Sequence, residues 1–92
     1  MTIREDMERI PLGSDFFYTW VSYDAVRVGI ILWYDACTVH EECRGLIPFA
    51  NYPNKDVRWE LIRQEPLTIT PSVLQQPCNF HGFITDGRWV SA

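Results

Sequence analysis

The chain has 92 residues, which suffices for one packed domain but not for two independent cores. Hydrophobic residues make up 47% and aromatic residues 14%, including four tryptophans, so a folded core is expected and extensive disorder is excluded. Eight basic and twelve acidic residues give a net charge of -4, without the basic run typical of nucleic-acid binding. A protein is therefore the expected partner, and direct contact with nucleic acid is not expected.

No segment is apolar for long enough to cross a bilayer as a helix. The longest apolar run covers residues 28–34, whereas a membrane-spanning helix needs about 20 residues. The first nine residues are rich in charge and show no secretory signal. We therefore expect a cytoplasmic protein without a membrane association, or one in the host cytoplasm if a phage encodes it. In that compartment stable disulfides are unusual.

The N-terminal half predicts one short helix followed by strands. Residues 3–10 can form a helix that ends at Pro11, within a loose N-terminal segment over residues 1–13. Residues 15–22 are dense in aromatic and β-branched side chains, which favour a strand. Residues 25–34 pass into a continuous apolar run, which predicts the central strand of a sheet.

The C-terminal half predicts shorter strands joined by turns. Residues 46–50 indicate an edge strand, and residues 57–62 and 68–70 indicate two more. Residues 71–74 can open at most one turn of helix, in which Ser72 would act as a cap. The alternative is a functional role for Ser72, because it lies near the loop that holds Cys78 and His81.

The end of the chain carries the clearest local signal. Residues 80–85 and 88–91 flank Asp86-Gly87, a pair that favours a tight hairpin turn. The expected fold is one mostly β domain over residues 1–92, with about six short strands in a small antiparallel sheet or open barrel and little helix. We expect Trp33 and Trp59 inside it and Trp20 and Trp89 exposed.

All three cysteines and both histidines fall in two short loops, residues 37–45 and 77–82. His40 and Cys43 are separated by two residues, and so are Cys78 and His81. Two such pairs can complete the four-coordinate shell that Zn²⁺ prefers, and thiolate and imidazole donors favour zinc over Mg²⁺ or Ca²⁺. The spacing predicts a structural zinc site that closes the fold as a metal knot.

Several alternatives for this site stay open. Cys37 has the same spacing from His40 and could replace it, and Glu41 or Glu42 could also ligate. If only three protein ligands bind the zinc, the open position could activate water with Glu41 or Glu42 as the general base, which would make a zinc hydrolase.

Other catalytic patterns find little support. The two loops imitate a zinc deaminase signature with Glu42 as proton shuttle, but the strand-like flanks leave no room for the helices that this chemistry needs. The four serines have no histidine at a recognisable spacing, although spacing does not exclude a pair formed in space. No catalytic residue is therefore assigned by a serine-based pattern.

The stretch from Cys43 to Trp89 carries several short motifs in a fixed order. They are Cys43-Arg44-Gly45, Trp59, Leu67-Thr68-Ile69-Thr70-Pro71-Ser72-Val73, Cys78-Asn79-Phe80-His81 and Ile84-Thr85-Asp86-Gly87-Arg88. This order resembles a family of small bacterial and phage metal-binding domains of uncharacterised function, some encoded beside bacterial ubiquitin-like conjugation genes. The resemblance implies a mostly β metal-binding fold but no established reaction.

Together these observations favour a small zinc-binding protein-interaction module and a non-enzymatic role. Such a module could be a phage or mobile-element accessory protein that occupies the surface of a host protein, in host takeover or against host defence. The zinc-dependent hydrolase is the alternative. The sequence leaves the oligomeric state open.

Overall fold

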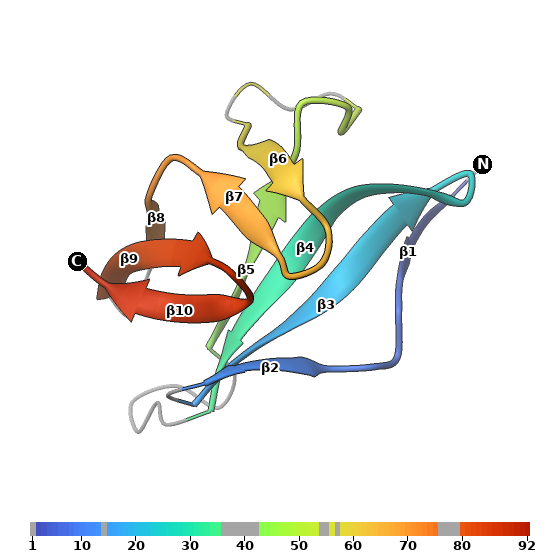
Figure 1. The fold of residues 1–92 in the computed structure, drawn as a ribbon. Coiled ribbons are helices and arrows are strands. Elements are labelled where there is room, and N and C mark those ends of the chain that lie inside the picture. Colours follow the sequence, from blue (N-terminus) through green and yellow to red (C-terminus); the bar gives the residue numbers. More distant parts are fainter. Residues whose placement is uncertain (1, 14, 36–42, 54–55, 57, 76–79) are drawn as a thin grey trace.

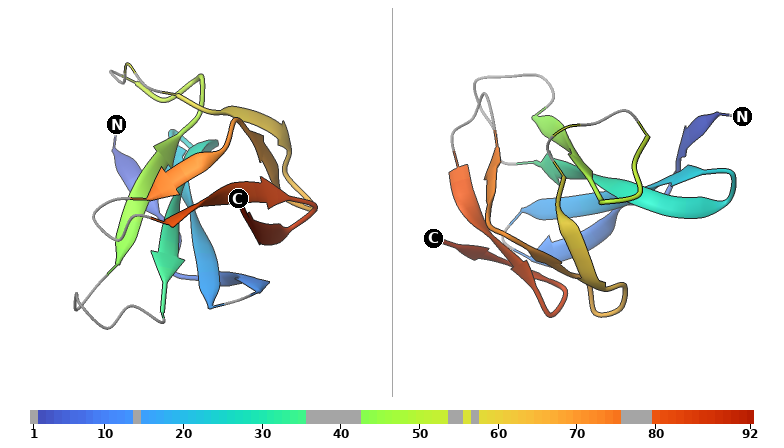
Figure 2. Two further views of the ribbon diagram at one scale, coloured as in Figure 1. Left: turned by 90° about the vertical axis from the view of Figure 1, so that its left-hand side faces the viewer. Right: turned by 90° about the horizontal axis from the view of Figure 1, so that it is seen from above.

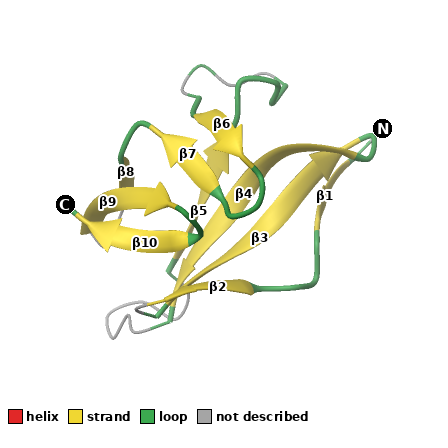
Figure 3. Cartoon of the chain, in the orientation of Figure 1, coloured by secondary structure: helices red, strands yellow, loops and turns green. Residues whose placement is uncertain are grey.

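The computed structural model describes residues 2–13, 15–35, 43–53, 56, 58–75 and 80–92. Strands and turns make up this part of the chain, and Figure 3 shows no helix in it. The described strands are β1 (Ile3–Glu5), β2 (Ile10–Gly13), β3 (Phe16–Tyr23), β4 (Val26–Tyr34), β5 (Arg44–Pro48), β6 (Glu60–Arg63), β7 (Thr68–Thr70), β8 (Val73–Gln75), β9 (Phe80–Thr85) and β10 (Arg88–Ser91). The prediction of a mostly β fold is confirmed.

The largest sheet has the order β1-β3-β4-β5, and β2 also pairs with β3. All its pairings are antiparallel. The run from Val28 to Leu32 is buried throughout, as expected for a strand with neighbours on both edges and cover on both faces. The prediction of residues 25–34 as the central strand is therefore confirmed.

A β-bulge in β4 divides its side chains between the two faces of the sheet. The register shifts between Val21, which pairs with Gly29, and Ser22, which pairs with Arg27. The extra residue, Val28, packs with Val21 and Ile31 rather than with the main core. A Cβ on Gly29 would lie 2.8 Å from the carbonyl oxygen of Ile47, so only glycine allows β5 to approach this closely.

Two smaller sheets cover one face of the large one (Figures 1 and 2). One is the β6-β7 pair and the other has the order β10-β9-β8. The main core lies between these layers; its members, one or more from each layer, are Leu12, Phe16, Tyr18, Trp20, Ile30, Leu32, Ile47, Phe49, Leu67, Ile69, Val73, Ile84 and Trp89. The described strands form three separate sheets rather than one closed barrel.

The C-terminal hairpin matches its prediction. Residues 80–85 and 88–91 pair as β9 and β10, and the turn residues Asp86 and Gly87 both have positive φ angles, 51° and 74°. These are the backbone angles for which Asp-Gly is suited.

Two predicted helical segments are strands instead. Residues 3–10 contain β1 and the start of β2, and both strands pair with β3. Residues 73–75 form β8, which pairs with β9. In both places a neighbouring strand supplies the hydrogen bonds that an isolated short helix would have had to make for itself.

The prediction for the tryptophans is also wrong. Trp20 and Trp89 are 4% and 6% exposed, whereas Trp33 and Trp59 are only partly buried. Trp20 is two and four positions from Tyr18 and Phe16 along β3, so it lies on the same face of the strand and contacts the main core. Trp33 lies on the opposite face of the large sheet, where the Arg9 guanidinium lies 3.8 Å from its ring centroid.

The described residues include no helix with the length and hydropathy of a membrane span.

Candidate active site

A serine and a histidine meet on the exposed side of the small C-terminal sheet. The Nε2 atom of His81 lies 2.8 Å from the Oγ atom of Ser72. This is a normal distance for a hydroxyl proton donated to a ring nitrogen. Ser72 is half-buried and His81 is exposed, so solvent and a large substrate can both reach the pair.

The pairing of β8 with β9 brings these two residues together. Val73 lies opposite Gly82 and Leu74 lies opposite His81. Ser72 directly precedes β8, so it is two positions from Leu74 and points to the same face. Ser72 and His81 are thus diagonal neighbours across an antiparallel pair, a relation that long side chains can bridge.

Ser72 is fixed on both sides by neighbouring groups. The indole Nε1 of Trp59 donates a hydrogen bond to the Ser72 carbonyl oxygen at 3.2 Å. The next residue, Val73, is 1% exposed and belongs to the main core. The serine backbone is therefore anchored while its hydroxyl faces outward.

His81 lies on a strand that is held tightly against the core. A Cβ on the following residue, Gly82, would lie 2.6 Å from the Trp89 ring and 2.5 Å from the Val90 carbonyl oxygen. The Trp89 ring stacks on Phe16 of the large sheet, with centroids 4.2 Å apart. The backbone of His81 also accepts a hydrogen bond from the Ala92 amide at 2.9 Å. Position 82 needs a glycine so that β9 can lie this close to Trp89.

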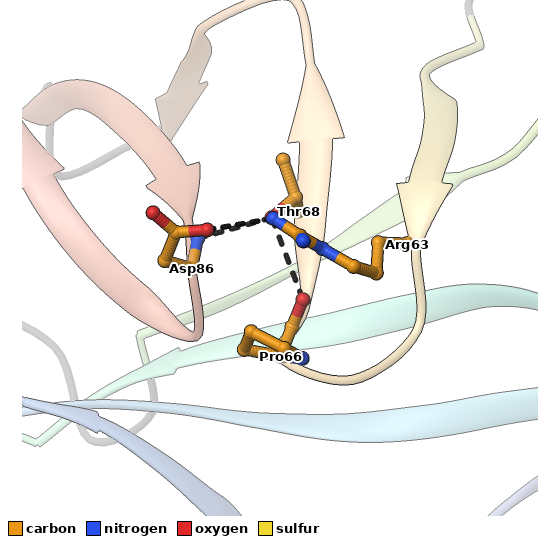
Figure 4. A network of polar contacts seen from close by, with 4 residues as sticks. All are labelled: Arg63, Pro66, Thr68 and Asp86. Carbon is orange, nitrogen blue, oxygen red and sulfur yellow. Dashed lines mark hydrogen bonds and ion pairs between the residues drawn. The ribbon is translucent and has the colours of Figure 1, made fainter.

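A polar network ties the far end of the same hairpin to the turn between β6 and β7 (Figure 4). Arg63 and Asp86 form an ion pair at 2.7 Å. The Asp86 amide donates to Thr68 Oγ1 at 3.0 Å, and the Thr68 hydroxyl donates to the Pro66 carbonyl at 3.4 Å. The hairpin that carries His81 and the hairpin that leads to Ser72 are thus fastened to each other.

The arrangement can perform nucleophilic catalysis. An imidazole with Nε2 unprotonated accepts the serine proton and leaves Oγ as a nucleophile. In the part of the chain that the structure describes, no carboxylate hydrogen-bonds to the other ring nitrogen of His81. We name Ser72 and His81 the serine–histidine dyad.

Most residues of the predicted metal site lie outside the described residues. These are Cys37, His40, Glu41, Glu42 and Cys78. Of the remaining two, His81 contacts Ser72, and Cys43 is 3% exposed and disulfide-bonded. The described residues hold no group of three or more His, Cys, Asp or Glu side chains placed for a metal ion.

The disulfide at Cys43 differs from the expectation that the cysteines stay reduced.

The contact between Ser72 and His81 has the geometry that serine hydrolases use to activate their nucleophile. The comparison with protein families agrees and is more specific. Residues 7–92 match the family described as bacterial ubiquitination-like system serine protease, BubE, and the chain belongs to this family. No curated protein and no solved structure matches the chain.

This membership overturns the prediction of a zinc-binding interaction module, because the family is one of proteases. The alternative of a hydrolase is closer to the family, but its zinc-dependent form does not correspond to a serine protease. The resemblance to proteins encoded near bacterial ubiquitin-like conjugation genes agrees with the family, whereas its motif details stay a prediction.

The sequence alone favours a capping role for Ser72 over a functional one, because the segment after Pro71 is compatible with a helical turn. As a strand, that segment places Ser72 beside His81. One signal for a strand is present, because Val73 is β-branched and comes shortly before the strand predicted over residues 80–85. The pairing of these two segments is the missing step.

Proposed function

We propose that this protein is a serine protease of a bacterial ubiquitination-like system, with Ser72 as nucleophile and His81 as general base and acid. The observation that carries the proposal is the 2.8 Å contact between Ser72 Oγ and His81 Nε2. Membership in the family supports a protein substrate that belongs to the same conjugation system.

The reaction follows from the dyad. The Ser72 oxygen attacks the carbonyl carbon of the scissile bond while His81 Nε2 takes the hydroxyl proton. The carbon–nitrogen bond then breaks, and His81 gives that proton to the leaving nitrogen. Water attacks the resulting acyl-serine, gives a proton to Nε2 and releases the carboxylic acid as Ser72 regains its proton. Both proton transfers use the one nitrogen that contacts Ser72.

The first test is covalent labelling of the full-length chain with a fluorophosphonate probe, followed by peptide mass mapping. We expect the label on Ser72, and we expect Ser72→Ala to abolish it. His81→Gln should slow labelling about 10²–10⁴-fold, the usual contribution of a general base. Ser22→Ala is the matched control, because Ser22 lies on β3 in the large sheet.

A second test measures cleavage of the ubiquitin-like protein of the same system, fused or conjugated through its C-terminus to a reporter. The wild-type chain should release the reporter, and both dyad variants should fail to do so. Labelling at another serine, or full activity in Ser72→Ala, would disprove the assignment.

A further inference from the structure

The face that carries the dyad also carries a group of exposed apolar side chains. Leu74, Phe83 and Val90 are 54%, 44% and 49% exposed. Large apolar residues of this kind are usually buried, and a cluster of them on a surface indicates a binding site. We name Leu74, Phe83 and Val90 the apolar patch.

The strand registers place the apolar patch on the same face as the dyad. Leu74 lies opposite His81 on β9, and Val90 of β10 lies opposite Phe83. Phe83 is two positions from His81, and their ring centroids are 6.4 Å apart. The alternate residues Val73, Ile84 and Trp89 point the other way, into the main core. The patch therefore lies beside Ser72 and His81 on this face instead of supporting the fold.

This face holds little charge. Apart from His81, the described side chains of β8, β9 and β10 include one charged group, Arg88, at the turn end of the hairpin. Among the described side chains of these three strands, a strongly acidic or basic segment would find little charge to pair with, whereas an apolar segment would bury surface from both molecules.

We infer that the apolar patch is the substrate subsite of the dyad and that it binds an extended polypeptide segment with aliphatic or aromatic side chains next to the scissile bond. This inference rests on the proposed function, because a bond attacked by Ser72 must lie across this face. Extended segments place successive side chains on alternate sides, so one or two of them would contact the patch while the scissile carbonyl faces Ser72.

The experiment compares two internally quenched decapeptides of identical length and charge. One carries Leu, Phe and Val around its centre, and the other carries Ser, Asn and Thr at those positions. For the full-length chain we expect kcat/KM to be about 10–100-fold higher for the apolar peptide, the range that one well-filled hydrophobic subsite gives. Phe83→Ser and Leu74→Ser should each lower this ratio several-fold.

Ile62→Ser is the matched control, because Ile62 is 53% exposed on β6 and lies outside the small C-terminal sheet. It should leave the ratio unchanged. A binding measurement with Ser72→Ala, by fluorescence anisotropy of both peptides, separates recognition from cleavage and should show the same preference.

The possible outcomes distinguish the two hypotheses. Ser72 labelling with no preference between the peptides, or an equal effect of Ile62→Ser, would overturn the apolar subsite and leave the protease intact. Preferential binding by Ser72→Ala without cleavage or labelling in the wild-type chain would support the patch as a binding surface and overturn the protease assignment. Absence of preference in both measurements, with no labelling, would overturn both.

Discussion

Replacing Gly82 with alanine should both destabilise the fold and disturb the dyad. The new Cβ would meet the Val90 carbonyl oxygen at 2.5 Å and the Trp89 ring at 2.6 Å. Ordinary contact begins near 3.4 Å, so the strand or the ring must move by about 0.8–0.9 Å. The Val90 oxygen belongs to the backbone, and the Trp89 ring stacks against Phe16. Neither group can therefore move aside easily.

Overpacking of this kind costs about 1–3 kcal/mol. For a domain of this length, a loss of about 2 kcal/mol lowers Tm by about 8–16 °C. The larger effect should fall on activity, because Gly82 adjoins His81 and a displacement of about 1 Å at a catalytic group can cost about 10²-fold in rate.

The assay combines thermal melting, urea unfolding and the fluorophosphonate labelling rate for Gly82→Ala and for Thr85→Ala. Thr85 is exposed on the same strand, so its replacement should change stability by no more than about 0.5 kcal/mol. A Tm for Gly82→Ala within about 2 °C of the wild type would correspond to a change of only about 0.25–0.5 kcal/mol. Together with an unchanged labelling rate, it would refute the close approach of Trp89 to β9.

Three further predictions follow from single contacts. Trp59→Phe keeps an aromatic ring but removes the indole donor to the Ser72 carbonyl oxygen. The free energy of unfolding should fall by about 0.5–1.5 kcal/mol, and kcat should fall by a larger factor than KM changes. An unaltered kcat would contradict an anchoring role for Trp59. Asp86→Asn removes the exposed ion pair with Arg63 and should lower the free energy of unfolding by less than about 1 kcal/mol. This difference should become smaller in 1 M salt, because the Debye length there is only about 3 Å and the charges are screened. Burial raises the pKa of Tyr18 above its usual value, so the folded state favours the protonated phenol. The contribution of this phenol to the free energy of unfolding is fully present below about pH 10 and decreases as the pH rises through the folded-state pKa. The slope is at most about 1.4 kcal/mol per pH unit. The test is urea unfolding near pH 8 and near pH 11, the latter about one unit above the usual tyrosine pKa. Tyr18→Phe should lose less unfolding free energy than the wild type between these two pH values. Equal losses in the two proteins would disprove the role of Tyr18.

The sequence predicts best where local chemistry alone decides the structure. Asp86-Gly87 supplies the two positive φ angles of the last turn, and the apolar run from Val28 to Leu32 can only be a buried strand or helix. Both elements form as expected. These signals depend on neighbouring residues, so no distant partner has to be known.

The sequence predicts poorly where a distant strand decides the structure. Residues 3–5 and 73–75 are short and become strands because β3 and β9 offer hydrogen bonds to them. The same reason hides the dyad, which depends on the register between β8 and β9. The burial of Trp20 likewise depends on which face of β3 the second layer covers, and that choice is made by segments far along the chain.

Ser72 and His81 are nine positions apart in the sequence, one directly before β8 and the other on β9. The whole of the proposed catalytic pair therefore belongs to one supersecondary unit. The core packing behind this unit uses Val73, Ile84 and Trp89, none of which touches the reaction face. One substitution at position 72 or 81 could therefore end catalysis while the scaffold and the apolar patch persist. Evolution can in this way turn such a protease into a catalytically silent binder of the same targets, or restore it, without rebuilding the fold.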